Sequence, residues 1–143
     1  MQAQTALIHA VVVDAPLSVA EHEALVAHPG AGAVVSFGGV IRNHDHGRSV
    51  EALEYVGHPA AEQIIAEVAA DIAASDGVYA IAVSHRIGKL TVGDVALACA
   101  VSSAHRGEAF AACARLVEEV KHRLPIWKRQ VFSDGTDEWV DCP

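Results

Sequence analysis

One stretch near the carboxyl end, KHRLPIWKR at residues 121–129, constrains the fold more than any other. It holds four of the ten Lys and Arg residues of a chain whose formal net charge is -8. Pro125 lies in its middle, and because proline lacks an N–H and clashes with the preceding turn, a helix arriving from the amino side should end before it. We expect a helix end followed by an extended segment, which could aim Lys121 and Lys128 at one place from two elements. A solvated helix end, whose cations suit the negative pole of the helix dipole, is the alternative.

The remainder of the chain mixes strand-like and helix-like segments without strict alternation. Strands are predicted at 5–14, 31–42, 49–57, 78–88, 94–104, 126–132 and 139–141. A short helix is predicted at 19–28, where Ser18 and Glu21 form a capping-box signature, and long helices at 59–75 and 103–124. After the polar loop NHDHGR, segment 49–57 should return as the partner of a hairpin-like pair, and KLTVGD should be a turn or short loop. We infer one α+β domain, residues 1–143, with a largely antiparallel sheet.

Composition restricts the possible partners and location of the protein. A chain of 143 residues buries roughly 68 to 70% of its unfolded surface, which is enough for a real core. The pI near 5.5 argues against nucleic acid or an anionic membrane as the main partner, although a local anion site is compatible with it. No segment resembles a signal peptide, and no apolar run approaches ~20 residues, so we expect a soluble, cytoplasmic protein. Three cysteines without framework spacing indicate reduced thiols.

The second long helix is predicted to turn an apolar stripe toward the core. Lys121 lies about 20° outside that stripe, which itself spans roughly 60°. Its ammonium could extend to the surface, or it could be a partly desolvated amine at the rim of a pocket, suited to acid, base or nucleophilic chemistry. The predicted stripe consists of Phe110, Cys113, Val117, Val120 and Leu124.

The start of the same helix offers a second cationic position. His105 and Arg106 lie where free N–H groups of a helix N-terminus can bind an anion. Lys121 is sixteen residues further on, about 24 Å along the axis, so one small ligand cannot easily reach both ends of one helix. Either there are two anion sites, or His105 and Arg106 come from the twofold mate of the subunit that supplies Lys121 and Lys128.

Metal-based and thiol-based sites are weaker interpretations. His44 and His46, with Asp45 or His58, could chelate a metal, but two loop histidines without a fixed third ligand are weak evidence, and a polar loop is the simpler reading. A persulfide enzyme would need an activated cysteine, and the sequence shows no activating environment for any of the three. Cys113 belongs to the apolar stripe, Cys99 to an apolar strand and Cys142 to the chain end.

Four segments, taken in order, carry a resemblance to a known family. They are FGGVIRNH (37–44), HRIGKL (85–90), SSAHRGEAF (102–110) and VKHRLPIWKRQ (120–130). Together they resemble the large, catalytic subunit of molybdopterin synthase, the MoaE family, and the similarity extends to the terminal DGTDEWV. The resemblance implies an α/β-hammerhead fold with no resident cofactor or metal.

The resemblance also implies a reaction and its partners. Such subunits convert cyclic pyranopterin monophosphate (precursor Z) into molybdopterin by inserting two sulfurs, in molybdenum cofactor biosynthesis. The sulfur comes from a thiocarboxylate on the C-terminal Gly-Gly of a small ubiquitin-like subunit, and the family forms a heterotetramer around a homodimer of large subunits. This chain ends Asp141-Cys142-Pro143, so we expect a separate polypeptide to be the donor. A non-catalytic phosphate-ligand sensor or assembly module using the same basic pocket is the alternative.

Site residues are carried over position by position from the resemblance. It makes Lys121 and Lys128 the catalytic pair, with Lys121 nearest the thiocarboxylate and Lys128 holding substrate. Gln130 departs from the pattern, because relatives commonly have Glu after the Lys-Arg pair, and the departure puts an acid/base role at this position in doubt. A second departure is Val56-Gly57-His58, to which no role is assigned. The full substrate-binding set is Val40, Ile41, Arg42, His105, Arg106, Lys121, Lys128, Arg129 and Gln130.

Overall fold

The chain forms two β-sheets, which the computed structural model describes over residues 6–142. The first sheet has the strand order β1-β5-β7-β2. Among its described strands, β1 and β5 pair in parallel and the other two pairings are antiparallel, as expected for a largely antiparallel sheet. Its strands are β1 (Leu7–Val13), β5 (Val78–Arg86), β7 (Val95–Ser103) and β2 (Ala33–Val40).

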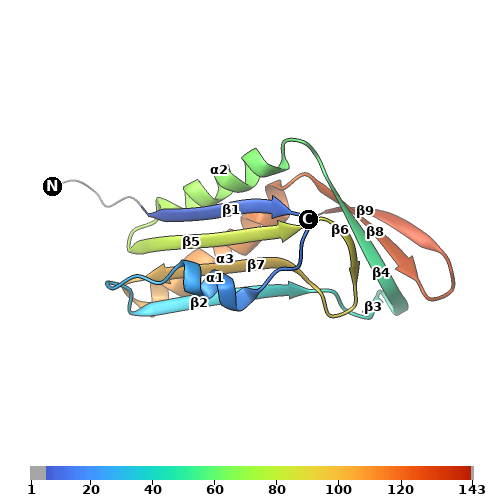
Figure 1. Cartoon of the computed structure of the whole chain (residues 1–143), viewed down its shortest axis with the longest axis horizontal. Coiled ribbons are helices and arrows are strands. Elements are labelled where there is room, and N and C mark those ends of the chain that lie inside the picture. Colours follow the sequence, from blue (N-terminus) through green and yellow to red (C-terminus); the bar gives the residue numbers. More distant parts are fainter. Residues whose placement is uncertain (1–5, 143) are drawn as a thin grey trace.

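Helices cover both faces of this first sheet (Figure 1). The long helices α2 (Ala61–Ala73) and α3 (Arg106–Arg123) pack on one face, and the short α1 (Val19–Leu25) packs on the other. The predicted cap of α1 is confirmed, because the Ser18 hydroxyl accepts a hydrogen bond of 3.1 Å from the Glu21 N–H.

The second sheet lies across one end of the first (Figure 1). Its main path is β3-β4-β8-β9, and β6 pairs with β4 beside that path. All of its pairings are antiparallel. Its strands are β3 (His44–Asp45), β4 (Arg48–Gly57), β6 (Gly88–Thr91), β8 (Ile126–Phe132) and β9 (Asp137–Cys142).

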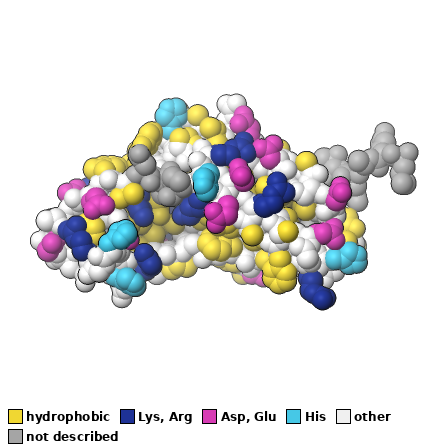
Figure 2. Space-filling view, turned by 180° about the vertical axis from the view of Figure 1, so that it is seen from behind, with side chains coloured by type: hydrophobic (Ala, Val, Ile, Leu, Met, Phe, Trp, Pro, Cys, Tyr) yellow, Lys and Arg dark blue, Asp and Glu magenta, His cyan; other side chains and the backbone are white. Residues whose placement is uncertain are grey.

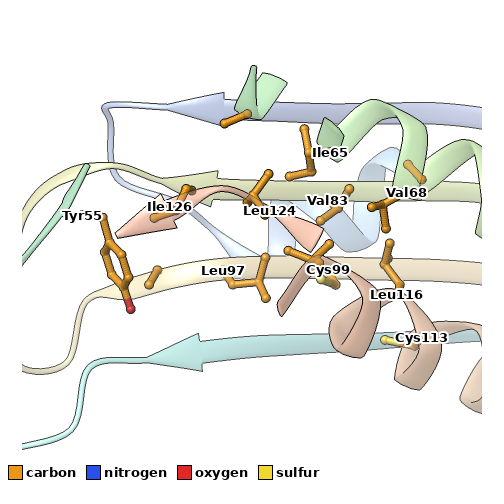
Figure 3. Close-up of a cluster of buried hydrophobic side chains, with 14 of the residues drawn as sticks. Tyr55, Ile65, Val68, Val83, Leu97, Cys99, Cys113, Leu116, Leu124 and Ile126 are labelled. Atoms are coloured by element: carbon orange, nitrogen blue, oxygen red, sulfur yellow. The ribbon is translucent and has the colours of Figure 1, made fainter. Parts of the chain in front are cut away.

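The hydrophobic core lies between the first sheet and the long helices and continues to the second sheet (Figure 3). Ile65 and Val68 of α2 and Leu116 of α3 are fully buried against it. Burial of each such side chain contributes about 1.5–3 kcal/mol. Tyr55 of β4 stands at one end of this cluster, so the core reaches the face of β4 that supports the site described below.

Two sequence predictions about strand pairing were wrong. The strand after the NHDHGR loop does not return beside the one before it, because β2 pairs with β7 and β4 pairs with β8 and β6. The hairpin is confined to β3 and the start of β4, around a two-residue turn. His46 (φ 50°) and Gly47 (φ 78°) both have positive φ there, as a type I′ turn requires. The predicted KLTVGD turn is right at Val92 and Gly93, but the first half of the segment belongs to β6, which is a strand because β4 offers it a partner.

The predicted apolar stripe of α3 was wrong at one residue. Phe110 is 61% exposed, whereas Ala109, Ala112 and Leu116 are buried and Cys113 and Val120 lie in the core as expected. The buried face of α3 is thus rotated from the predicted stripe toward Ala109 and Ala112. These small side chains allow α3 to approach the sheet closely. In the described residues, no helix is long and apolar enough to cross a membrane.

Candidate active site

A cationic pocket of about 230 Å³ lies where the end of α3, the end of β2 and the second sheet meet. It brings together six of the nine residues of the predicted binding set, including both candidate catalytic lysines. The lining residues are Val40, Ile41, Arg42, His44, Asp45, Leu53, Tyr55, Lys121, Lys128 and Gln130. A larger hollow of about 560 Å³ near the end of α2 is lined in its described part mostly by small and apolar residues, together with Asp76 and Tyr79, and contains no Lys, Arg or His.

Two elements deliver the two lysines to the pocket. Lys121 lies in the last turn of α3, which ends at Arg123, just before Pro125. Lys128 lies on β8, where its Cα faces that of Tyr55 on β4. Both lysines are partly buried. The helix stop at Pro125 therefore lets one short sequence reach the pocket from two directions, as the sequence suggested.

Strand alternation separates the neighbours of Lys128. Lys128 and Gln130 share one face of β8, opposite Tyr55 and Leu53 of β4, and all four line the pocket. Arg129 lies between them and points to the other face. There its guanidinium donates to Asp137 at 2.7 Å and lies 3.9 Å from Glu54.

The segment that leaves β2 forms another wall of the pocket. Val40 is 52% exposed, and Ile41 is buried at 6%. The Ile41 N–H donates to the Asp94 carbonyl at 3.0 Å, and its carbonyl accepts from the Gly93 N–H at 2.9 Å. The backbone of Ile41 is therefore already satisfied by the turn before β7, and this bonding fixes the position from which Arg42 extends.

His105 and Arg106 lie outside this pocket. His105 occupies the N-cap position of α3 without a side-chain capping hydrogen bond, Arg106 begins the helix, and both are exposed. They are separated from Lys121 by most of the helix, about 24 Å along its axis. Within one chain, the two ends of α3 do not form a common site.

Asp45 is the one carboxylate among the described lining residues. Its Oδ2 accepts a hydrogen bond of 2.8 Å from Gln130 Nε2, and its Oδ1 accepts one of 3.3 Å from Arg42. His46 Nε2 lies 3.7 Å from the same Oδ1. The hydrogen bond from Gln130 lowers the pKa of Asp45, and the positive charges of Lys128 and Arg42 act in the same direction. Asp45 is therefore ionised at neutral pH.

Beneath the pocket lies His85, which is 3% exposed. Its Nδ1 lies 2.8 Å from the Arg86 carbonyl oxygen. Because a carbonyl only accepts, Nδ1 carries the proton of the neutral ring. The ring stands edge-on to Tyr55, with centroids 5.0 Å apart and planes at 80°. Burial, together with the nearby Lys121 cation, lowers the pKa of His85 to about 4, although the hydrogen bond to the Arg86 carbonyl acts in the opposite direction.

The thiols and the loop histidines do not form an alternative centre in the described chain. Cys99 and Cys113 are buried and unpaired, and burial raises the pKa of both thiols, which disfavours the reactive thiolate. The side chain of Cys142 lies outside the described residues. His44 bonds to Asn43 at 2.9 Å, and no group of three His, Cys, Asp or Glu residues within 6–142 is arranged to hold a metal ion.

Sequence reasoning did not assign Leu53, Tyr55 and His85 to the site. The alternation of side chains along a strand could have been used for β8, because it places Lys128 and Gln130 on one face and Arg129 on the other. The pairing partners of that face depend on register between distant strands, which no local pattern specifies. His85 lay inside the HRIGKL segment without any local sign of its burial.

Lys, Arg and His side chains, mixed with acidic ones, are spread over the back of the molecule, and several of them lie over its left half (Figure 2). That half contains the second sheet, which lies at the right in Figure 1. The fold and the pocket together define a class: an α+β protein with a cationic pocket between a helix end and a second sheet.

Comparison with known proteins identifies the family within that class. Residues 12–123 match the family described as MoaE protein, a range that includes Lys121 and ends before Lys128. The molybdopterin synthase catalytic subunit of Nostoc sp. is 41% identical over 88% of this chain and 78% of its own length. That of Salmonella typhimurium is 40% identical over 92% and 89%. The chain therefore belongs to the MoaE family.

Solved structures agree with this assignment. Molybdopterin synthase from Staphylococcus aureus superimposes with a TM-score of 0.83 at 33% identity, covering 90% of this chain and 94% of that one. One chain in the complex of subunits 1 and 2 of molybdopterin-converting factor from Helicobacter pylori has the same fold, with a TM-score of 0.71 at 18% identity over 95% of this chain and 90% of that one.

Proposed function

We propose that this chain is the catalytic subunit of a cytoplasmic molybdopterin synthase, which converts precursor Z to molybdopterin. The observation that carries the proposal is the convergence of Lys121 and Lys128 on one pocket in a member of the MoaE family. The substrate bears a cyclic phosphate and the sulfur donor is a thiocarboxylate, so both bring negative charge. A pocket with two lysines and Arg42 offsets that charge and supplies charge-assisted hydrogen bonds.

The two lysines take different roles in this proposal. Lys121 lies in the last turn of α3 above the buried Tyr55 and His85, and it meets the thiocarboxylate, where it transfers a proton or polarises the acyl group. Lys128 extends from the second sheet beside Arg42, and it holds the substrate and stabilises developing charge. The donor is the C-terminal Gly-Gly tail of a small ubiquitin-like subunit, which supplies both sulfurs.

The proposed assembly is a homodimer of this chain within a heterotetramer, with His105 and Arg106 completing the pocket of the twofold mate. Exposed apolar surface supports this arrangement. Phe110 lies one helical turn after Arg106 and is 61% exposed, and the edge strand β2 exposes Val34 and Phe37 at 47% and 36%. Hydrophobic side chains follow the lower edge of the back of the molecule, the edge on which β2 lies in Figure 1 (Figure 2). Exposed apolar groups of this kind mark protein interfaces.

The direct test is to mix the chain with thiocarboxylated small subunit and precursor Z and to assay molybdopterin. We expect product with the wild type. The Lys121→Ala variant should still bind the small subunit but form dithiolene at least about a hundredfold more slowly, because acid–base contributions are typically 10²–10⁴-fold. A Lys121→Ala variant that converts precursor at the normal rate would refute the catalytic assignment. A wild type that binds phosphate ligands without forming product would instead favour the sensor or assembly module.

A further inference from the structure

The pocket contains a bonded pair, Asp45 and Gln130, that the roles of the two lysines do not explain. Gln130 is 2% exposed, and its amide donates to Asp45 Oδ2 at 2.8 Å. Asp45 Oδ1 accepts from Arg42 at 3.3 Å, so each carboxylate oxygen has its own donor. A carboxylate in an anion-binding pocket repels the anion. A pocket that only had to attract negative charge would therefore not be expected to place Asp45 among its three cations.

The backbone holds Asp45 at this place. Asp45 pairs with Arg48 across the β3–β4 hairpin, and the turn between them consists of His46 and Gly47. The Val50 N–H donates to the Asn43 carbonyl at 2.8 Å and closes the base of the same hairpin. Gln130 comes from β8, which pairs with β4 along its length. The pair therefore connects the hairpin tip to the sheet that carries Lys128.

We propose that Asp45, fixed by Gln130, is a positioning carboxylate that orients Arg42 toward the substrate anion. Arg42 has a side chain that is 65% exposed, so without a partner it would sample many rotamers. Asp45 restricts it to one region above the pocket. The low pKa of the Asp45 carboxyl keeps this anchor charged through the neutral range. The inference rests on the proposed function for its catalytic meaning, but its structural content can be measured without catalysis.

Exchanging the two side chains provides the test. Asp45→Asn keeps the shape and removes the charge. Gln130→Glu sets two carboxyl groups at hydrogen-bond distance, where both cannot ionise and one proton is shared. The double variant D45N/Q130E moves the carboxylate to position 130 and the amide to position 45, which retains the hydrogen bond and the net charge. Gln63→Glu on α2 is the matched control, since Gln63 also donates to a carboxylate, Glu67 at 3.1 Å, but on an exposed surface.

We expect each single variant to lower kcat for molybdopterin formation by about tenfold or more, and the double variant to recover most of that loss, because residues in contact are energetically coupled. D45N should bind inorganic phosphate more tightly than the wild type in calorimetry, since a negative charge has been removed, while its kcat falls. The Q130E profile should become pH-dependent near neutrality. A purely structural role would weaken binding and turnover together and leave the pH profile unchanged.

Two results would overturn the inference: a D45N variant with wild-type kcat, or a double variant whose loss is the product of the single losses. Thermal unfolding of each variant separates these outcomes from misfolding. If the wild type makes no molybdopterin, the proposed function fails. The phosphate affinities of the wild type, the two single variants and the double variant then still test the positioning role of Asp45. Coupling between positions 45 and 130 in these affinities supports the positioning role, and additivity refutes it.

Discussion

His85 shows how burial sets the charge beneath the site. The ring is buried against Tyr55, and its Nδ1–H donates a hydrogen bond to the Arg86 carbonyl. The neutral imidazole therefore needs no counter-ion. A second positive charge next to Lys121 would have to be desolvated and would repel the lysine. The neutral histidine therefore allows a lysine to stand at the pocket floor without a competing cation.

This burial makes stability depend on pH. In the unfolded chain the pKa of His85 is 6.5, and in the folded chain it is about 4, so between these values the unfolded state binds more protons. The stabilising contribution is fully present above pH 6.5 and is lost as pH falls toward 4, by about 3 kcal/mol in total. We expect the difference in unfolding free energy between wild type and His85→Phe to shrink by about that amount from pH 6.5 to pH 4. Denaturant titrations at several pH values measure the unfolding free energy of both proteins. If that free energy changed equally with pH in both, His85 would not have the low pKa assigned to it.

Single residues also show what the sequence could reveal about the site. Lys121 and Lys128 could be found from local chemistry, because a charge cluster, helical phase and one proline are all local signals. Asp45 was noticed as a possible metal ligand, but its bond to Gln130 joins residues 85 positions apart. Tyr55 and His85 carry no local mark of their place at the pocket, because that place follows from packing between distant strands.

Among the elements, α3 carries apolar side chains on a buried face and on an exposed face. Leu116 is fully buried against the core, whereas Phe110, about one and a half turns earlier, is largely exposed. The sequence predicted the helix well but placed Phe110 inside, because hydrophobicity alone does not show whether a side chain is buried within the chain. The short strands β3 and β6 were missed for a related reason: each is a strand because β4 pairs with it, and its own residues read as a turn.

The two faces of α3 should respond differently to truncation. Leu116→Ala should lower the free energy of unfolding by about 2–5 kcal/mol at every protein concentration, because it opens a cavity in the core. Phe110→Ala should change the stability of the isolated chain by less than about 0.5 kcal/mol. Its effect should grow with protein concentration, as expected for a residue that stabilises an association. The comparison is made by measuring chemical denaturation of both variants at several protein concentrations. Analytical ultracentrifugation of the same samples measures how much of each variant is dimeric. Equal effects of both substitutions at all concentrations would place Phe110 outside any interface.

At the scale of the whole molecule, the pocket lies at the junction of two sheets. The first sheet and its helices supply Lys121, and the second supplies Lys128 and Gln130. The overall class, α+β with largely antiparallel pairing, followed from the order and type of the segments. The division into two sheets did not, because register and partner choice between strands are long-range properties.

A shared site predicts complementation between defective subunits. Lys121→Ala and Arg106→Ala should each be inactive alone. When the two variants are unfolded together and reassembled in equal amounts, about half of the dimers are mixed and each mixed dimer has one intact pocket, so about a quarter of wild-type activity should return. Lys121→Ala mixed with Lys128→Ala is the control, and it should recover nothing because both lysines belong to the same side of the pocket. If the first mixture is as inactive as its parents, the pocket is built from one chain.

The continuous course of α3 has a consequence for which changes in chain length the protein can accept. Each residue added inside the helix would turn Lys121 by about 100° and shift it by about 1.5 Å relative to Arg106 and Phe110. The number of residues between Arg106 and Lys121 must therefore stay the same if both side chains are to keep their positions. The exposed turn at Asp134 and Gly135, which joins β8 to β9 outside the pocket, carries no such restriction. Insertions and deletions in related chains should accordingly collect in that turn and be excluded from the helix.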